Sequence, residues 1–451
     1  MVEKKTQIAV IIIGILVGIL AFVLPMTSFV KVLGALVVVI AILRKVEIGV
    51  FLVVALTPFS PSTMPLVGLV ILCAISLVLK LFWDKDFKLR WGNIEVCILF
   101  FAIMLVYASV TSFAFQSSIR IMLVFGSFLL FYVILYNTIT SKRALYGLIV
   151  VGAFSALLVG LYGIYQQYFG AVMEQSWIDV EMFEDLSMRV YSTWENPNVL
   201  GEYLVLWIPI SFGLMWSVRQ WFHKIVFAGV TGVLLLCMVF TLSRGSWLGL
   251  MLAMAVFAIM SSKILVLLGG IGVLSLPFAL PAHIINRFLS IGNLQDTSTS
   301  YRVSIWQGAL RMAQDYWPSG IGVGSEAFAK IYPRYALSGA AFALHAHNFY
   351  IQVLAEVGVF GVLALILVLF AFYKNIFASY WDTQDKFLST FLIAGCAGMT
   401  GFLLNGLFDN VWYNYRMVLV FWTMIALSAV ACNLAKETGA DKHDKSSTCG
   451  K

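Results

Sequence analysis

The stretch MPLVGLVILCAISLVLKLFW, residues 64–83, decides the fold, because its only charged side chain is Lys80. A helix of about 20 apolar residues is long enough to cross the hydrocarbon core of a bilayer. Runs of this kind recur from end to end of the chain. They are continuously apolar and do not alternate with polar residues, which excludes the strands of a membrane β-barrel. The sequence therefore predicts an all-α fold, a polytopic transmembrane helical bundle.

The composition leads to the same prediction. Of 451 residues, 61% are hydrophobic and 11% are charged, whereas soluble domains carry about 45–50% apolar and about 25% charged residues. These values exclude a soluble enzyme, a disordered chain and a coiled coil. The net charge of +7 is not gathered on a basic soluble segment, so we expect no nucleic-acid partner. The six cysteines show no CxxC spacing, which argues against a disulfide framework and a zinc site.

The apolar segments number about fourteen, and we expect about 12–14 spans. Their approximate limits are 7–25, 29–43, 46–58, 64–83, 93–115, 118–139, 143–168, 199–218, 222–243, 246–262, 264–281, 348–376, 387–409 and 414–435. The second and third are short for a hydrocarbon layer of roughly 30 Å. The first follows Lys4 and Lys5 and lacks a small-residue cleavage site, so we interpret it as an uncleaved span.

Basic residues predict the orientation. With the N-terminus in the cytoplasm, 19 of the 29 lysines and arginines fall in cytoplasmic connections, as the positive-inside rule requires. Both termini are then cytoplasmic. The ten outside are mostly arginines, whose planar fork binds phosphate and carboxylate oxygens bidentately; their pairing with external acids is the alternative. These ten residues are Lys31, Arg120, Arg189, Arg244, Arg287, Arg302, Arg311, Lys330, Arg334 and Arg416.

Four parts organise the chain. Residues 1–195 are N-terminal transmembrane helices with an acidic external loop at 169–198, and residues 196–376 form a core with an external loop at 282–347. C-terminal transmembrane helices (377–435) and a cytoplasmic tail (436–451) follow. Within the second loop, residues 302–317 predict an amphipathic helix at the membrane surface, with one apolar face. That face comprises Val303, Trp306, Leu310 and Trp317, and a flexible Gly-rich turn follows at Pro318–Phe328.

Two motifs place arginines at the expected outer face. TLSRGSWLG, residues 241–249, sets Arg244 where two apolar segments meet, with Gly245 and Gly249 allowing close helix approach. Arg244 binds an anion or reaches lipid headgroups. In STSYRVSIWQGAL, residues 298–310, Ser300 or a neighbour caps a helix whose first turn holds Arg302. Exposed N–H groups there favour an anion, although an ordinary surface arginine is the alternative.

A third motif supplies titratable groups. LHAHNFYIQVLAEVGVFG, residues 344–361, sets His345, His347 and Asn348 just before a long span. His347 at the outer lip can take a proton from a hydroxyl, or it is a structural interfacial histidine. Neither HExxH nor an acid beside the two histidines completes a metal site, so we expect no metal. Glu356, two turns into the span, is a functional candidate, or it pairs with a buried arginine.

The remaining polar clusters flank spans. In WENPNVLGEYL, residues 194–204, Asn196 and Asn198 belong to a turn that starts the next span. In NGLFDNVWYNYRM, residues 405–417, Asp409 and Arg416 flank an aromatic external turn that a membrane aromatic belt explains.

The order of these motifs resembles that of the O-antigen ligase and O-antigen polymerase superfamily of bacterial membrane glycosyltransferases. The resemblance rests on SRGSWLG, then an external loop that opens with Arg302 to Trp306 as RxxxW and contains GIGVG, then HNFYIQVLAEVGVFG. It covers residues 196–370 well, and makes 196–376 the ligase-like core. The first 190 residues match only in being multi-span, and the span count slightly exceeds the usual dozen.

The resemblance implies a glycosyltransferase of the bacterial cytoplasmic (inner) membrane, acting in polysaccharide biosynthesis for the cell envelope. The donor would be a glycan on undecaprenyl diphosphate. The acceptor would be a lipid A-core sugar in a ligase or another lipid-linked repeat in a polymerase. The family needs no metal, no nucleotide sugar and no other cofactor. Its essential arginines and histidine map onto Arg244, Arg302 and His347.

The chemistry of the residues agrees. Cleavage of a sugar–diphosphate bond builds negative charge on the departing phosphate, which arginines could hold where many soluble enzymes use a divalent metal. His347 could deprotonate or orient the acceptor hydroxyl. The further substrate-binding candidates, for diphosphate or glycan, are Arg120, Arg334, Arg416, Asn348, Asn198 and Glu356. The alternatives are a multi-span transporter, for example of an inorganic anion, and a non-catalytic membrane scaffold.

Overall fold

The structure is a computed structural model that describes residues 22, 24–170, 189–279, 281–289, 297–337 and 340–448. All regular secondary structure in these ranges is helical, which confirms the predicted fold class. The elements are α2 (Met26–Arg44), α3 (Val46–Leu56), η1 (Thr57–Phe59), α4 (Met64–Trp83), α5 (Asn93–Val110), α6 (Phe115–Thr138), α7 (Lys142–Phe169), η3 (Ser192–Trp194), α8 (Pro197–Ser217), α9 (Trp221–Phe240), α10 (Arg244–Ser261), α11 (Lys263–Ala279), α12 (Ala282–Leu289), α13 (Thr297–Asp315), α14 (Ser325–Ile331), η4 (Tyr332–Arg334), α15 (Phe349–Asp382), α16 (Lys386–Asn405) and α17 (Tyr415–Thr448).

Eleven of the described helices are long and apolar enough to cross a membrane: α2, α4 to α10 and α15 to α17. The apolar parts of α3 and α11 are shorter, as expected for the third segment. The second segment forms the 19-residue α2 and is not short. The first predicted span, 7–25, lies almost wholly outside the described residues. The chain is therefore a multi-pass membrane protein.

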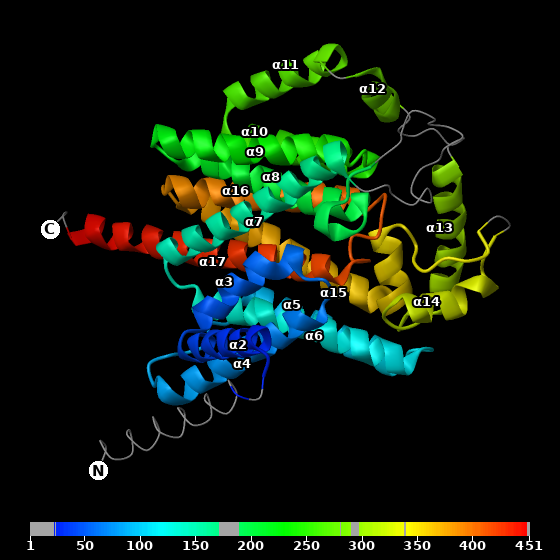
Figure 1. The fold of residues 1–451 in the computed structure, drawn as a ribbon, viewed down its shortest axis with the longest axis horizontal. Coiled ribbons are helices and arrows are strands. Elements are labelled where there is room, and N and C mark those ends of the chain that lie inside the picture. Colours follow the sequence, from blue (N-terminus) through cyan, green and yellow to red (C-terminus); the bar gives the residue numbers. More distant parts are fainter. Residues whose placement is uncertain are drawn as a thin grey trace.

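Helices α10 and α16, which lie close together in the bundle (Figure 1), pack through small residues. A Cβ placed on Gly249 of α10 would meet the backbone carbonyl of Gly401 on α16, so these two helices touch through their backbones. Such contact between small residues is how membrane helices approach closely, and it confirms the predicted role of Gly249. Gly245, one turn earlier, packs in the same way against Asn405 and Phe408.

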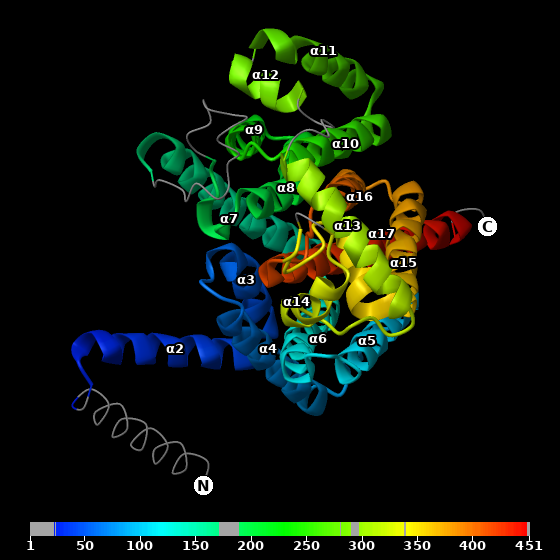
Figure 2. The same ribbon diagram turned by 90° about the vertical axis from the view of Figure 1, so that its right-hand side faces the viewer.

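One end of the bundle carries a cap built from α13, α14, η4 and the segments that connect them (Figures 1 and 2). The cap has its own small core, separate from that of the bundle. The predicted helix over residues 302–317 forms as part of α13, and its predicted contact with the membrane surface stays a prediction. Leu310 and Trp317 are exposed, while Ile305, Ala309 and Met312 are buried. The 305–309–312 stripe faces the rest of the cap, so contact within the cap decides which side of α13 is covered.

The Gly-rich turn is held in place and is not an open segment. Gly358 adopts φ 71° and interrupts α15. At the interruption, backbone carbonyls of α15 lose the N–H groups that would donate to them in a regular helix. The turn supplies replacements: Ile321 N donates to Ala355 O at 2.8 Å, and Gly322 N donates to Glu356 O at 3.2 Å. A Cβ on Gly320 (φ 68°) would collide with that same backbone. Only glycine permits this docking of the cap onto α15.

Candidate active site

The candidate site lies at the capped end of the bundle, where four segments that are distant in sequence converge. These are the first turn of α8, the first part of α13, the residues before α15, and the loop 406–414 between α16 and α17. Asn198, Arg302, His347 and Asp409 come from these four segments in turn. Contacts between their side chains hold the segments together.

His347 is held in one orientation by contacts on both sides of its residue. Its Nδ1 lies 3.2 Å from Asp409 Oδ1, and its backbone carbonyl accepts a hydrogen bond from Trp306 Nε1 at 3.3 Å. The carboxylate favours a proton on Nδ1, which leaves Nε2 as the basic atom. The backbone of His347 adopts φ 45°, a conformation that costs a non-glycine residue free energy and that is found most often at functional sites.

Asp409 is the centre of the network, and it was not among the predicted site residues. Its Oδ2 accepts from Asn198 Nδ2 at 2.8 Å, and its Oδ1 accepts from Asn410 N at 2.9 Å. Burial opposes ionisation, but His347 and Arg302 outweigh it and hold the pKa of Asp409 well below its usual range. The carboxylate therefore stays ionised. In the sequence it looks like one more residue of an aromatic turn, so only its position reveals it.

Arg302 retains most of its hydrogen-bonding capacity. Its Nη2 lies 3.8 Å from Asp409 Oδ2, a long ion pair, and its side chain is 24% exposed. It makes no shorter polar contact with the described part of the chain. Most of its guanidinium donors are thus available to an oxyanion, and Arg302 and His347 contact the same carboxylate of Asp409.

Arg189 extends the positive charge of the site and was not predicted as a site residue. It is buried, donating from Nε to Thr241 O at 3.0 Å and from Nη2 to Asn198 Oδ1 at 2.8 Å. Burial, together with the charges of Arg287, Arg302 and Arg244, lowers its pKa to about 9. Four arginines therefore lie close enough to repel one another, an arrangement that favours binding of a multivalent anion.

Arg244 begins α10, as the sequence predicts for a residue where two apolar segments meet. The residue two positions before it, Leu242, adopts φ 51°. This left-handed residue ends the α9–α10 connection and turns the chain so that α10 starts at the arginine cluster. Arg244, Arg302 and His347 are thus brought to one region, while their roles stay a prediction.

In the structure an acid, Asp409, lies beside the two histidines. The lack of such an acid was therefore a wrong reason for expecting no metal. His345, His347 and Asp409 place potential ligand atoms within 4.8 Å of one another. Asp409 already accepts hydrogen bonds from protein donors, however, and the arginines oppose a cation. His345 Nδ1 accepts from His347 N at 3.2 Å, and burial, with the neighbouring His347, lowers the pKa of His345 to about 3. His345 is therefore neutral.

The two predicted asparagines support the site. Asn348 caps α15: its Oδ1 accepts from the backbone N of Tyr350 and Ile351, both at 3.0 Å. Its Nδ2 donates to Leu407 O at 2.9 Å, which ties the loop that carries Asp409 to the start of α15. Asn198 bridges Arg189 and Asp409. Asn196 caps α8 through Asn198 N, confirming the predicted helix start.

The other predicted residues lie apart from the histidine. Arg120 on α6 and Arg334 in η4 are exposed, and no described contact joins them to the site. Arg416 is buried and donates to Ser60 O at 2.7 Å and Thr193 O at 3.1 Å, and its predicted part in substrate binding stays a prediction. Glu356 forms no described ion pair. Its Oε1 accepts from Gly324 N and Gln352 Nε2 instead.

A known family model matches part of the chain. Residues 229–366 match the family model described as O-Antigen ligase. The matched range runs from α9 to the first half of α15, so it includes Arg244, Arg302 and His347 but not Asp409, Asn198 or Arg189. No curated protein matches the chain. The order of motifs and the matched segment agree, so residues 229–366 are similar to the O-antigen ligase family.

Proposed function

We propose that the chain is a metal-independent glycosyltransferase. It transfers glycan from an undecaprenyl-diphosphate-linked donor to an acceptor hydroxyl at the outer face of the bacterial cytoplasmic membrane. The observation that carries the proposal is the His347–Asp409 pair beside Arg302 in a cluster of four arginines. The match of residues 229–366 to the O-antigen ligase family model supports the reaction class. A lipid-linked acceptor repeat would make the protein a polymerase, and a lipid A-core sugar would make it a ligase.

The proposed reaction balances with these residues alone. The acceptor oxygen forms a bond to the anomeric carbon as the bond from that carbon to the phosphate oxygen breaks. His347 Nε2 takes the hydroxyl proton, and Asp409 stabilises the resulting imidazolium. Arg302 and Arg244 take up the charge that develops on the departing diphosphate. Arg189, fixed by Thr241 and Asn198, adds positive potential.

Glycan transfer in membrane vesicles tests this proposal. His347→Ala is expected to lower transfer by about 10²–10⁴-fold, the usual contribution of general acid–base catalysis. His223→Ala is the matched control, because His223 lies exposed on α9. The variants must insert and fold equally well. Transfer at the normal rate by His347→Ala would contradict the site, and anion uptake into proteoliposomes lacking any glycan would favour a transporter.

Chemical labelling tests the orientation. We place the capped end outside, with both termini and residues 436–451 in the cytoplasm. A cysteine at Ser319, in the turn of the cap, is expected to react with a membrane-impermeant maleimide in intact spheroplasts. A cysteine at Ser389, at the opposite end of the bundle on α16, is expected to react only after lysis. The reverse pattern would contradict both the orientation and the use of an external donor.

A further inference from the structure

A cavity of about 530 Å³ lies beside the candidate site and takes no part in the mechanism above. Its volume falls in the range of small-molecule pockets, about 300–1,000 Å³. His345 lines it, and the His345 ring centroid lies 4.0 Å from that of His347. One side chain therefore separates the cavity from the proposed base.

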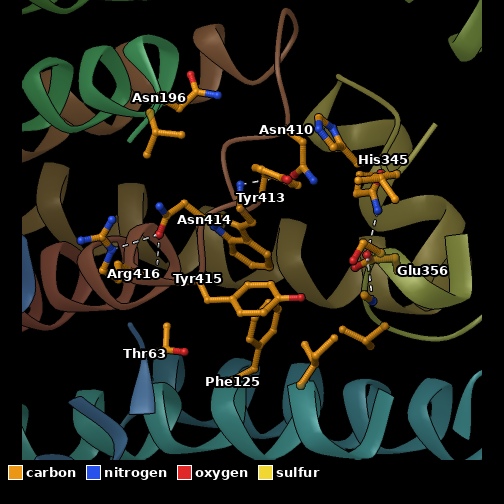
Figure 3. A pocket seen from close by; sticks show the side chains of 18 of the residues that line it. Thr63, Phe125, Asn196, His345, Glu356, Asn410, Tyr413, Asn414, Tyr415 and Arg416 are labelled. Atoms are coloured by element: carbon orange, nitrogen blue, oxygen red, sulfur yellow. Dashed lines mark hydrogen bonds between the residues drawn. The ribbon is translucent and has the colours of Figure 1, made fainter. Parts of the chain in front are cut away.

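Aromatic rings and carboxamides make up much of the cavity wall (Figure 3). Trp412, Tyr413 and Tyr415 come from the loop 406–414 and the start of α17, and Phe125 comes from α6. Tyr413 packs on His345 with ring centroids 4.4 Å apart. A sugar ring has an apolar face of C–H groups and a rim of hydroxyls, so it suits aromatic rings interspersed with amides.

Backbone N–H groups hold the side-chain oxygens of two asparagines in the cavity wall, and the Nδ2 groups of these side chains stay unused among the described residues. Asn410 Oδ1 accepts from Trp412 N at 3.3 Å, and Asn414 Oδ1 accepts from Arg416 N at 3.0 Å. The Nδ2 groups of these two asparagines have no partner in the part of the chain that the structure describes, nor has the hydroxyl of Tyr415. Donors held by a rigid loop lose little entropy on binding a ligand.

The charges around the cavity suit a diphosphate less well than the arginine cluster does. The carboxylates of Glu195 and Glu356 line the cavity together with one cation, Arg416. Arg416 spends its Nη1 on two backbone carbonyls and lies over the Trp194 ring at 4.8 Å. An anion therefore meets less positive charge here than at the arginine cluster beside His347. The molecule thus separates a surface for anions from a pocket for uncharged, hydroxyl-rich groups.

We propose that this cavity is a saccharide subsite, which holds uncharged sugar residues of the glycan while its diphosphate, or the acceptor hydroxyl, meets Arg302 and His347. This inference rests on the proposed function, because it assigns a substrate group to the same site. The sugar could come from the donor glycan or from the acceptor glycan, and the experiment below separates the two.

Binding to the purified full-length protein in nanodiscs tests the subsite without requiring transfer. Three probes are titrated calorimetrically: the donor's repeat-unit oligosaccharide freed of lipid and diphosphate by mild acid, the deacylated acceptor glycan, and undecaprenyl diphosphate without sugar. Thr63→Trp fills the cavity from the start of α4, where the Thr63 side chain makes no cap hydrogen bond. Tyr415→Phe removes one unused hydroxyl. The matched controls are Thr111→Trp at the end of α5 and Tyr165→Phe on α7.

The cavity variants are expected to weaken binding of a free glycan and to leave binding of undecaprenyl diphosphate nearly unchanged. Thr63→Trp weakens binding of one free glycan at least about tenfold by steric clash, and Tyr415→Phe weakens it about threefold to tenfold, the value of one hydrogen bond. Both leave undecaprenyl diphosphate binding within about twofold, and the controls change neither. Which glycan binds identifies the source. Absence of glycan binding to the wild type, or unchanged binding in both variants, overturns the subsite. Glycan binding without any transfer activity would instead overturn the proposed function.

Discussion

The two ends of the bundle handle charge in opposite ways. At the end opposite the cap, Lys80 lies 3.6 Å from Glu47 and Lys142 pairs with Asp385, and each of these lysine side chains is at least one-third exposed. At the capped end, the side chain of Asp409 is only 13% exposed and contacts three other side chains. The first kind of pair is solvated and simple; the second is a network of mutually dependent groups.

The comparison distinguishes charged residues that help to orient a membrane protein from charged residues that are suited to take part in a reaction. Exposed pairs contribute about 0–1 kcal/mol each, and lysines serve as well as any cation for topology. A buried carboxylate among arginines costs desolvation energy, and a network of hydrogen bonds must compensate for it. Left-handed backbone at Leu242 and His347 adds to that cost. Such an arrangement is consistent with selection for function, and the following variants test the contrast.

The largest effect is expected for Arg302→Ala. Loss of a guanidinium aimed at the leaving diphosphate should lower transfer by about 10²–10³-fold, similar to the loss of one preorganised donor in other enzymes. Arg311→Ala, an exposed arginine on the same helix, is the control. Vesicle transfer assays measure both. Equal activities would show that the arginine cluster does not take part in the reaction.

Asp409→Asn should have the next largest effect. The amide keeps the size but cannot hold the imidazolium of His347, so we expect transfer to fall about 10- to 100-fold. As a positioning residue, Asp409 should lower kcat and leave KM within about twofold, because it orients the base and does not contact the substrate. Asp385→Asn, at the other end, should leave both constants unchanged. A loss that follows only a smaller amount of folded protein would indicate a structural role alone.

Gly358→Ala tests how the cap is attached. The φ of 71° is costly for alanine, by roughly 1–3 kcal/mol, and the new Cβ would meet the carbonyls of Trp317 and Pro318. We expect a lower unfolding temperature and protease cleavage in the Gly-rich turn. Gly229→Ala on α9, where a Cβ meets nothing within 4 Å, is the control. Unchanged protease resistance in Gly358→Ala would contradict the docking role of the kink.

The exposed pair at the other end should matter least to stability. Lys142→Ala is expected to lower the free energy of unfolding by about 0–1 kcal/mol. Burial opposes ionisation of Asp385, but the Lys142 hydrogen bond outweighs it and lowers the Asp385 pKa. The contribution of the pair is therefore present above the unfolded pKa of about 3.9 and is lost as pH falls below it. Thermal unfolding between pH 7 and pH 3 measures this. A larger effect of Lys142→Ala at low pH would contradict the assignment.

No effect is expected from a chelator. EDTA dialysis should leave transfer unchanged, because the arginines of the site repel a cation near His345, His347 and Asp409. Assay before and after dialysis checks this. A loss of activity that added Zn²⁺ restores would show that the three residues bind a catalytic metal.

The sequence determined most of the bundle by itself. Apolar runs such as residues 64–83 form helices at the predicted places because a bilayer-length helix satisfies its own backbone hydrogen bonds. The ends of spans were also readable, since Asn196 and Asn348 cap their helices locally. Local rules suffice wherever all the partners of a residue lie within one or two turns.

Tertiary structure alone decided the site. Asp409 and His347 are 62 residues apart, and Asn198 lies 211 residues from Asp409, so no local pattern pairs them. The partners of the buried face of α13 and of Arg416 lie on distant segments, so no local pattern shows them either. A helix covers the side that its neighbours reach, and an arginine binds an external anion only if backbone carbonyls do not already use its donors. Those neighbours are set by how the whole bundle packs.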